Sequence, residues 1–187
     1  ITITDEVWNA ATAATETAVV VIGRYSSEGS DRNASKGDYY LSDAEYALIT
    51  RVAEEFENTI VVLNIGAVMD TSWIKGENGI MHEPVKGLDA VLCSWQGGME
   101  GGLATADILV GDVNPSGKTV DTWAQDYSYY PSSATFKESN SYVNYTEDIF
   151  VGYRYFETIP GAAEQVNYEF GYGLSYTTFE TKVDSVE

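Results

Sequence analysis

The fold is decided by a short apolar run, Ala18-Val19-Val20-Val21-Ile22. Its residues are almost all β-branched and do not alternate with polar ones, which favours a strand covered on both faces. Two similar runs follow along the chain, Thr59-Ile60-Val61-Val62-Leu63 and Leu88-Asp89-Ala90-Val91-Leu92. The three runs predict neighbouring strands in one mainly parallel sheet.

Helical patterns alternate with these strands. Residues 5–15 and 103–110 read as helices, and Gly111 ends the second of them. Ser42 and Glu45 have the spacing of a capping box at the start of another helix. A short helix is also expected between the second and third strands. This order predicts an α/β fold, a flavodoxin-like three-layer sandwich with helices on both faces of a mainly parallel sheet.

The fold places candidate ligand contacts in the loops that follow the strands, because parallel sheets bind ligands beyond their carboxyl ends. These loops are residues 23–38, 64–72 and 94–102. The first contains Glu28, which can donate or accept a proton if its pKa is raised by burial or a like charge. Asp31 and Arg32 can pair locally and fix this loop. Alternatively, Glu28 is simply one acidic residue among 29.

The composition excludes several classes of partner. With 29 acidic and 10 basic residues the chain has a net charge of −19, which argues against nucleic acid and anionic membrane as partners. No apolar run approaches the ~20 residues of a membrane helix. Cys93 and His82 are the only cysteine and histidine, so no intrachain disulfide, metal site or cofactor is predicted. Cys93 is expected in the core and His82 on the surface.

Residues 1–187 are expected to form a single α/β sandwich domain. It includes an irregular segment at about 124–148 and an aromatic, glycine-rich tail at about 168–180. Because the chain opens at Ile1 and not at Met, these residues are expected to be part of a longer protein.

Seven segments resemble, in the same order, the C-terminal α/β sandwich domain of glycoside hydrolase family 3, the β-glucosidase and β-xylosidase family. They are Val21-Ile22-Gly23-Arg24 with Ser27-Glu28-Gly29-Ser30-Asp31-Arg32; Gly37-Asp38-Tyr39-Tyr40-Leu41-Ser42; Val61-Val62-Leu63-Asn64-Ile65-Gly66; Asp89-Ala90-Val91-Leu92 with Trp95-Gln96-Gly97-Gly98-Met99-Glu100-Gly101-Gly102; Gly111-Asp112-Val113-Asn114-Pro115-Ser116-Gly117-Lys118; Val151-Gly152-Tyr153-Arg154-Tyr155-Phe156; and Phe170-Gly171-Tyr172-Gly173-Leu174-Ser175-Tyr176.

The resemblance implies a retaining, exo-acting β-glycosidase in which two domains each supply one catalytic carboxyl group. Its substrate is a β-linked glucoside or oligosaccharide, hydrolysed at a terminal β-linked sugar. A barrel domain outside these residues supplies an aspartate nucleophile, and this chain supplies Glu28 as the general acid/base. Ser27, Asp31 and Arg32 become candidates for substrate binding. Retaining hydrolysis needs two carboxyl groups ~5–5.5 Å apart, so this chain alone is expected to be inactive.

The chain departs from the usual family pattern beside the proposed acid/base residue and also after Trp95. Ser26-Ser27 stands where Ser-Gly is common, and Gln96-Gly97-Gly98 stands where Gln-Pro-Gly is common. Two other interpretations remain open. One is a non-catalytic carbohydrate-binding or interdomain module, and the other is an unrelated flavodoxin-like ligand-binding domain.

Overall fold

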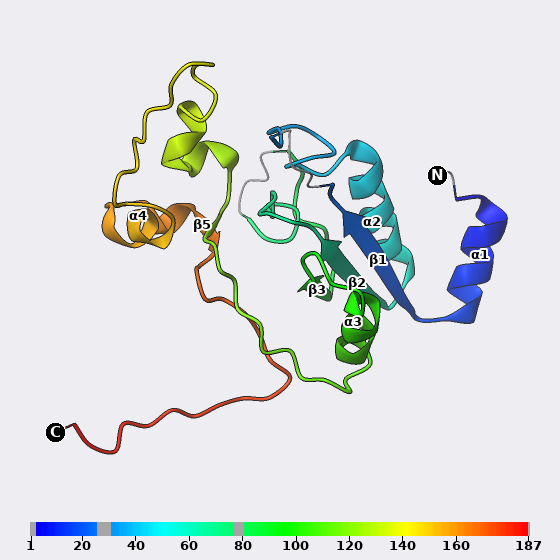
Figure 1. The fold of residues 1–187 in the computed structure, drawn as a ribbon. Helices are drawn as coiled ribbons and strands as arrows, with labels where there is room; N and C mark the ends of the chain where they lie inside the picture. Colours follow the sequence, from blue (N-terminus) through cyan, green and yellow to red (C-terminus); the bar gives the residue numbers. More distant parts are fainter. Residues whose placement is uncertain (1–2, 26–30, 77–80, 187) are drawn as a thin grey trace.

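The computed structural model describes residues 3–25, 31–76 and 81–186 (Figure 1). The helices are α1 Asp5–Ala14, α2 Asp43–Glu55, α3 Gly101–Leu109 and α4 Tyr153–Thr158. The strands are β1 Thr17–Gly23, β2 Asn58–Asn64, β3 Ala90–Cys93, β4 Trp123–Ala124 and β5 Val166–Tyr168. Three short 3-10 helices are η1 Tyr127–Tyr129, η2 Pro131–Ala134 and η3 Ala163–Gln165.

The three predicted strands are neighbours in one parallel sheet with the order β1-β2-β3. Val20 lies opposite Val61, and Leu63 lies opposite Cys93. The third strand begins later than predicted. Asp89, the second residue of the predicted strand, lies just before β3, and its carboxylate accepts a hydrogen bond from the Thr59 N–H at 2.7 Å. The predicted parallel sheet is confirmed.

Helix α2 begins where the sequence predicted. The Ser42 hydroxyl accepts from the Glu45 N–H at 3.2 Å, and the Glu45 carboxylate accepts from the Ser42 N–H at 2.8 Å, which completes the capping box. Ile49 and Val52 are buried in the main core against the sheet. Helix α1 packs on α2 through Trp8, whose indole N–H donates to the Glu55 carboxylate.

Helix α3 lies on the other side of the sheet from α2 (Figure 1). It spans Gly101–Leu109, close to the predicted 103–110, yet none of its side chains is buried and no side chain caps its first turn. The predicted short helix between β2 and β3 is absent from the described parts of that connection, 65–76 and 81–89, which form turns.

The C-terminal part has a small core of its own. β4 and β5 form an antiparallel pair, and Ala124, Phe156 and Ala162 are buried beside it. Trp123, the residue before Ala124, belongs to the main core, so β4 connects the two hydrophobic clusters. The predicted irregular segment contains η1 and η2, and residues 171–186 form no helix or strand. None of the described helices has the length and apolarity needed to cross a membrane.

Candidate functional site

The parallel register brings the carboxyl ends of the three strands to one edge of the sheet, because Gly23 lies opposite Asn64 and Leu63 lies opposite Cys93. The loops that leave this edge are hydrogen-bonded to one another or to the neighbouring strand. The Asp70 N–H donates to the Tyr39 carbonyl at 2.9 Å, and the Ser94 N–H donates to the Leu63 carbonyl at 3.0 Å. The loops expected to bind ligand therefore start from a common edge.

The predicted site residues are only partly within the described structure. Glu28 and Ser27 lie outside the described residues. Asp31 is exposed and Arg32 is half-buried. Arg32 forms its ion pair with Asp38, where Nε lies 2.7 Å from Oδ1, so within the described residues the expected local pair with Asp31 is replaced by a longer-range one.

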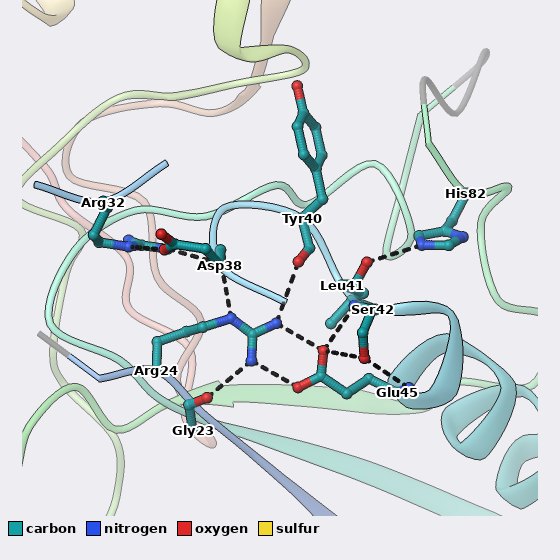
Figure 2. Close-up of polar contacts among 9 residues, drawn as sticks. All are labelled: Gly23, Arg24, Arg32, Asp38, Tyr40, Leu41, Ser42, Glu45 and His82. Atoms are coloured by element: carbon teal, nitrogen blue, oxygen red, sulfur yellow. Dashed lines mark hydrogen bonds and ion pairs between the residues drawn. The ribbon is translucent and has the colours of Figure 1, made fainter. Parts of the chain in front are cut away.

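Two arginines, Arg24 and Arg32, converge on the same loop through Asp38 and Glu45, and we call these four residues the arginine clamp (Figure 2). Arg24 directly follows β1 and its side chain is only 4% exposed. Its guanidinium donates to both Glu45 carboxylate oxygens at 2.7 and 2.9 Å, and its Nε donates to the Asp38 carbonyl at 2.7 Å. A further bond reaches the Gly23 carbonyl at 2.8 Å. Arg24 is therefore fully engaged inside the protein.

Arg32 approaches Asp38 from the other end of the segment. Its Nη2 donates to the Asp38 carbonyl at 2.9 Å, so one backbone oxygen accepts from both arginines. Its Nη1 donates to the Val68 carbonyl at 2.7 Å, in the loop after β2. The second Asp38 carboxylate oxygen accepts from the Asn33 N–H at 2.6 Å. The clamp thus joins the ends of the segment after β1 to a second loop and to α2.

Both clamp carboxyls are held in their charged forms. Burial raises the pKa of Asp38, but hydrogen bonds from the Asn33 N–H and Arg32, with the positive charges of both arginines, lower it below its ordinary value. Burial also raises the pKa of Glu45, and the bonds from Arg24 and Ser42 outweigh it, so that pKa is lowered too. Neither carboxyl has the raised pKa expected of a general acid at neutral pH.

A second group of polar residues lies in the interior near the clamp. Asp70 is fully buried, and its carboxylate accepts the N–H and the hydroxyl of Ser72 at 3.0 and 2.9 Å. Burial raises the pKa of Asp70 despite these bonds. The Tyr40 hydroxyl lies 3.3 Å from the Asp126 carboxylate. Burial raises the pKa of both Tyr39 and Tyr40, so both phenols stay neutral.

The one histidine and the one cysteine of the chain both pack against other parts of the fold. His82 was expected on the surface, but it is buried, because its ring stacks on Tyr46 at 4.2 Å between centroids. Its Nε2 lies 3.2 Å from the Leu41 carbonyl. Cys93 packs against the main core but is only half-buried, and burial raises its pKa to about 11. Within the described residues, no group of three or more His, Cys, Asp or Glu is arranged to hold a metal ion.

The loop after β3 carries the least favourable backbone at this edge. Trp95 has a φ of 54°, a left-handed conformation that costs a non-glycine residue of its kind ~1–3 kcal/mol and often marks a functional site. The Trp95 ring lies 5.8 Å from that of Trp123. Gly97 passes so close to Gly101 that an added Cβ would stand 2.8 Å from its Cα. A side chain at position 97 would therefore require this backbone to shift.

Sequence reasoning missed three parts of this site. Arg24 was placed only in a family-like segment, although its position directly after a strand marks that end of the sheet. Asp38 was likewise placed only in a family-like segment, and the link from Glu45 to Arg24 had no local signal. The capping box identified Glu45, but its sequence neighbourhood does not contain the arginine that it pairs with.

The parallel sheet and its flanking helices define the class, an α/β sandwich domain. Residues 3–176 match the family model described as the glycosyl hydrolase family 3 C-terminal domain. The chain belongs to this family.

The related proteins are much longer than this chain. "Beta-glucosidase A" of Butyrivibrio fibrisolvens is 49% identical over 191 residues, covering 90% of this chain and 22% of the relative. "Beta-glucosidase" of Ruminococcus albus is 41% identical, covering 96% and 18%. The solved structure of a β-glucosidase from Paenibacillus barengoltzii is 43% identical with a TM-score of 0.89, covering all of this chain and 19% of that one. The chain thus spans about a fifth of the length of the relatives it matches.

Proposed function

We propose that this chain is part of a retaining, exo-acting β-glycosidase, β-glucosidase-like, that hydrolyses terminal β-linked sugars. Glu28 is its general acid/base, and a barrel domain elsewhere in the same polypeptide supplies an aspartate nucleophile. The observation that carries the proposal is the family match across residues 3–176, which aligns the chain with relatives named β-glucosidases. The position of the loop after β1, at the carboxyl edge of the parallel sheet, supports it.

The proposed reaction divides its two carboxyl groups between two domains. The aspartate attacks the anomeric carbon and forms a glycosyl-enzyme, while Glu28 protonates the departing oxygen. Glu28 then takes a proton from the water that hydrolyses this intermediate. Two domains that close over a cleft can bring the carboxyls within the ~5–5.5 Å that retention requires.

Asp31 is a better candidate for binding the sugar than Arg32. The Nε, Nη1 and Nη2 atoms of Arg32 all donate to acceptors within the protein, whereas the neighbouring Asp31 is exposed. A sugar hydroxyl can donate to the Asp31 carboxylate. Ser27 remains a further candidate for the same purpose. The proposal therefore gives Arg32 a supporting role.

The decisive experiment replaces Glu28 with Ala in the complete enzyme. General acid catalysis contributes ~100–10,000-fold when the leaving group needs a proton. Hydrolysis of substrates with poor leaving groups should slow by that factor, while glycosylation by a dinitrophenyl glycoside should be nearly unchanged. Deglycosylation should still slow, and azide, which needs no base, should restore turnover and yield a β-glycosyl azide.

A structural role for Glu28 gives a different pattern. All substrates would then lose activity equally, the thermal midpoint would fall, and azide would have no effect. Glu54→Ala is a suitable control, because Glu54 is exposed on α2 and lies away from the carboxyl edge of the sheet. Its activity should match that of the unmodified enzyme.

The chain by itself should fold but barely hydrolyse aryl β-glycosides, since a single carboxylate cannot complete the two-step displacement. The purified 187-residue chain is tested with nitrophenyl β-glucoside. Turnover in the ~1–1000 per second range of ordinary enzymes would overturn the assignment of the nucleophile to another domain.

A second candidate is a non-catalytic carbohydrate-binding or interdomain module, which the short span of the chain relative to its relatives favours. Sequencing the flanking regions of the gene separates the two. A barrel domain with its aspartate supports the enzyme, and its absence supports the module.

A further inference from the structure

The arginine clamp is formed by residues on either side of segment 25–31 in the sequence. Arg24 stands where this segment leaves β1, and Arg32 stands where it returns to the described loop. Their guanidinium groups donate to the same carbonyl oxygen, that of Asp38, at 2.7 and 2.9 Å (Figure 2). The residues that flank segment 25–31 are therefore fixed relative to each other at one point.

The clamp is anchored to three separate elements. The Arg24 N–H donates to the Asn64 carbonyl at 3.0 Å and so extends the pairing of β1 with β2. The Glu45 carboxylate connects Arg24 to the first turn of α2. The Val68 carbonyl connects Arg32 to the loop after β2. Each anchor therefore helps to hold Arg24 or Arg32 in place.

Asp38 is the member of the clamp whose side chain holds the rest together. Its Oδ1 accepts from Arg32 at 2.7 Å and its Oδ2 accepts from the Asn33 N–H at 2.6 Å, which fixes the backbone that presents the shared carbonyl. The Asp38 side chain is 26% exposed, so its ion pair is partly solvated and adds modestly to stability. Asp38 therefore matters more for geometry than for stability, because it accepts four hydrogen bonds, two on its carboxylate and two on its carbonyl oxygen.

We propose that Asp38 is a positioning residue for the reaction, acting through Arg24 and Arg32 on the segment that carries Glu28. This inference rests on the proposed function of Glu28 as acid/base. A misplacement of about 1 Å costs a catalytic group ~100-fold in rate. A residue with a modest effect on stability can thus have a large effect on activity.

The test is a double-mutant cycle in the complete enzyme with Asp38→Asn and Glu28→Ala. Asparagine keeps the size of Asp38 but loses the charge, and its amide nitrogen cannot accept the bond that Oδ2 accepts now. With a nitrophenyl glycoside, Asp38→Asn alone should lower kcat/KM ~10–100-fold. Combined with Glu28→Ala it should lower it less than about twofold further, because the residue it positions is gone.

Asp43→Asn is the matched control. Asp43 also forms an ion pair near this loop, with Lys36 at 2.6 Å, but both side chains are exposed and neither contacts the clamp arginines. Its activity should stay within twofold of the unmodified enzyme. Arg32→Lys is a second test, because lysine keeps the charge but cannot bond to Asp38 and Val68 with the same planar fork. It should reproduce the loss seen with Asp38→Asn.

Two results would overturn the positioning role: unchanged activity of Asp38→Asn, or an equal fold-loss with and without Glu28. A different result would overturn the proposed function: Glu28→Ala would slow the hydrolysis of substrates with good and with poor leaving groups equally, and azide would not restore turnover. Non-additivity in that case still assigns Asp38 to the same segment, with a role other than acid/base positioning.

Discussion

Helices α2 and α3 flank the same parallel sheet on opposite sides, yet they are held in different ways. Helix α2 has a complete capping box, buries Ile49 and Val52, and bonds to the clamp through Glu45. Helix α3 has the more apolar sequence but buries no side chain, and Leu103 is 65% exposed. Apolar residues stabilise a helix only where neighbouring groups exclude water from them.

The two helices therefore contribute different shares of the chain's stability. The α2 side combines cap, core and buried ion pair in one place. The α3 side contributes its own backbone hydrogen bonds and little burial. Substitutions on the two helices should therefore have unequal effects on the free energy of unfolding of the 187-residue chain.

The largest effect is expected for Glu45→Ala. It leaves the Arg24 guanidinium, whose side chain is 4% exposed, without its partner, which costs about 3–5 kcal/mol. Urea unfolding of the chain measures the change. The exposed pair offers the contrast, since Asp43→Ala should cost about 0–1 kcal/mol. Equal losses from the two substitutions would contradict the difference in burial between these pairs.

Core truncation should separate the helices next. Ile49→Ala should destabilise the chain by about 2–5 kcal/mol, because it leaves a cavity where the side chain is fully buried. Leu103→Ala should change the free energy of unfolding by less than about 0.5 kcal/mol. The same urea titration compares them. A large loss from Leu103→Ala would show that α3 is packed in solution.

The caps should differ by a smaller amount. Ser42→Ala removes the hydroxyl that accepts the Glu45 N–H and should cost about 1 kcal/mol. Glu100 precedes α3 and makes no side-chain capping bond, so Glu100→Ala should cost less than about 0.5 kcal/mol. Thermal unfolding of the two variants tests this, and a lower midpoint for Glu100→Ala would be unexpected.

The smallest expected effect depends on pH. Because the pKa of Glu45 is lowered in the folded state, its contribution to stability is complete above the ordinary value of about 4 and is lost as the pH falls through the lowered value. The stability gap between the unmodified chain and Glu45→Ala should therefore narrow below about pH 4. The raised pKa of Asp70 has the opposite effect, since it favours the folded state as the pH falls. Asp70 is present both in the unmodified chain and in Glu45→Ala, so its effect cancels in the gap between them. A stability gap that widens as the pH falls would contradict this prediction.

Local patterns were enough to predict the central architecture. The β-branched runs around Val20, Val61 and Val91 predicted three strands, and all three form one parallel sheet. The spacing of Ser42 and Glu45 predicted the start of α2. These signals are readable because strand propensity and helix capping depend on residues that are close in sequence. The role of Glu28 came from the resemblance to a family, and it stays a prediction.

The tertiary structure decided which distant groups meet. Arg24 donates hydrogen bonds to Asp38, fourteen positions along the chain, and to Glu45, twenty-one positions along. Arg32 donates to Val68, thirty-six positions along. No local pattern encodes these partners, because they depend on strand register and on the path of the loops. The burial of His82 against Tyr46 has the same origin. Local sequence was therefore enough for the three strands, the cap of α2 and the family, whereas the clamp, the buried histidine and the exposed face of α3 follow from how the elements pack.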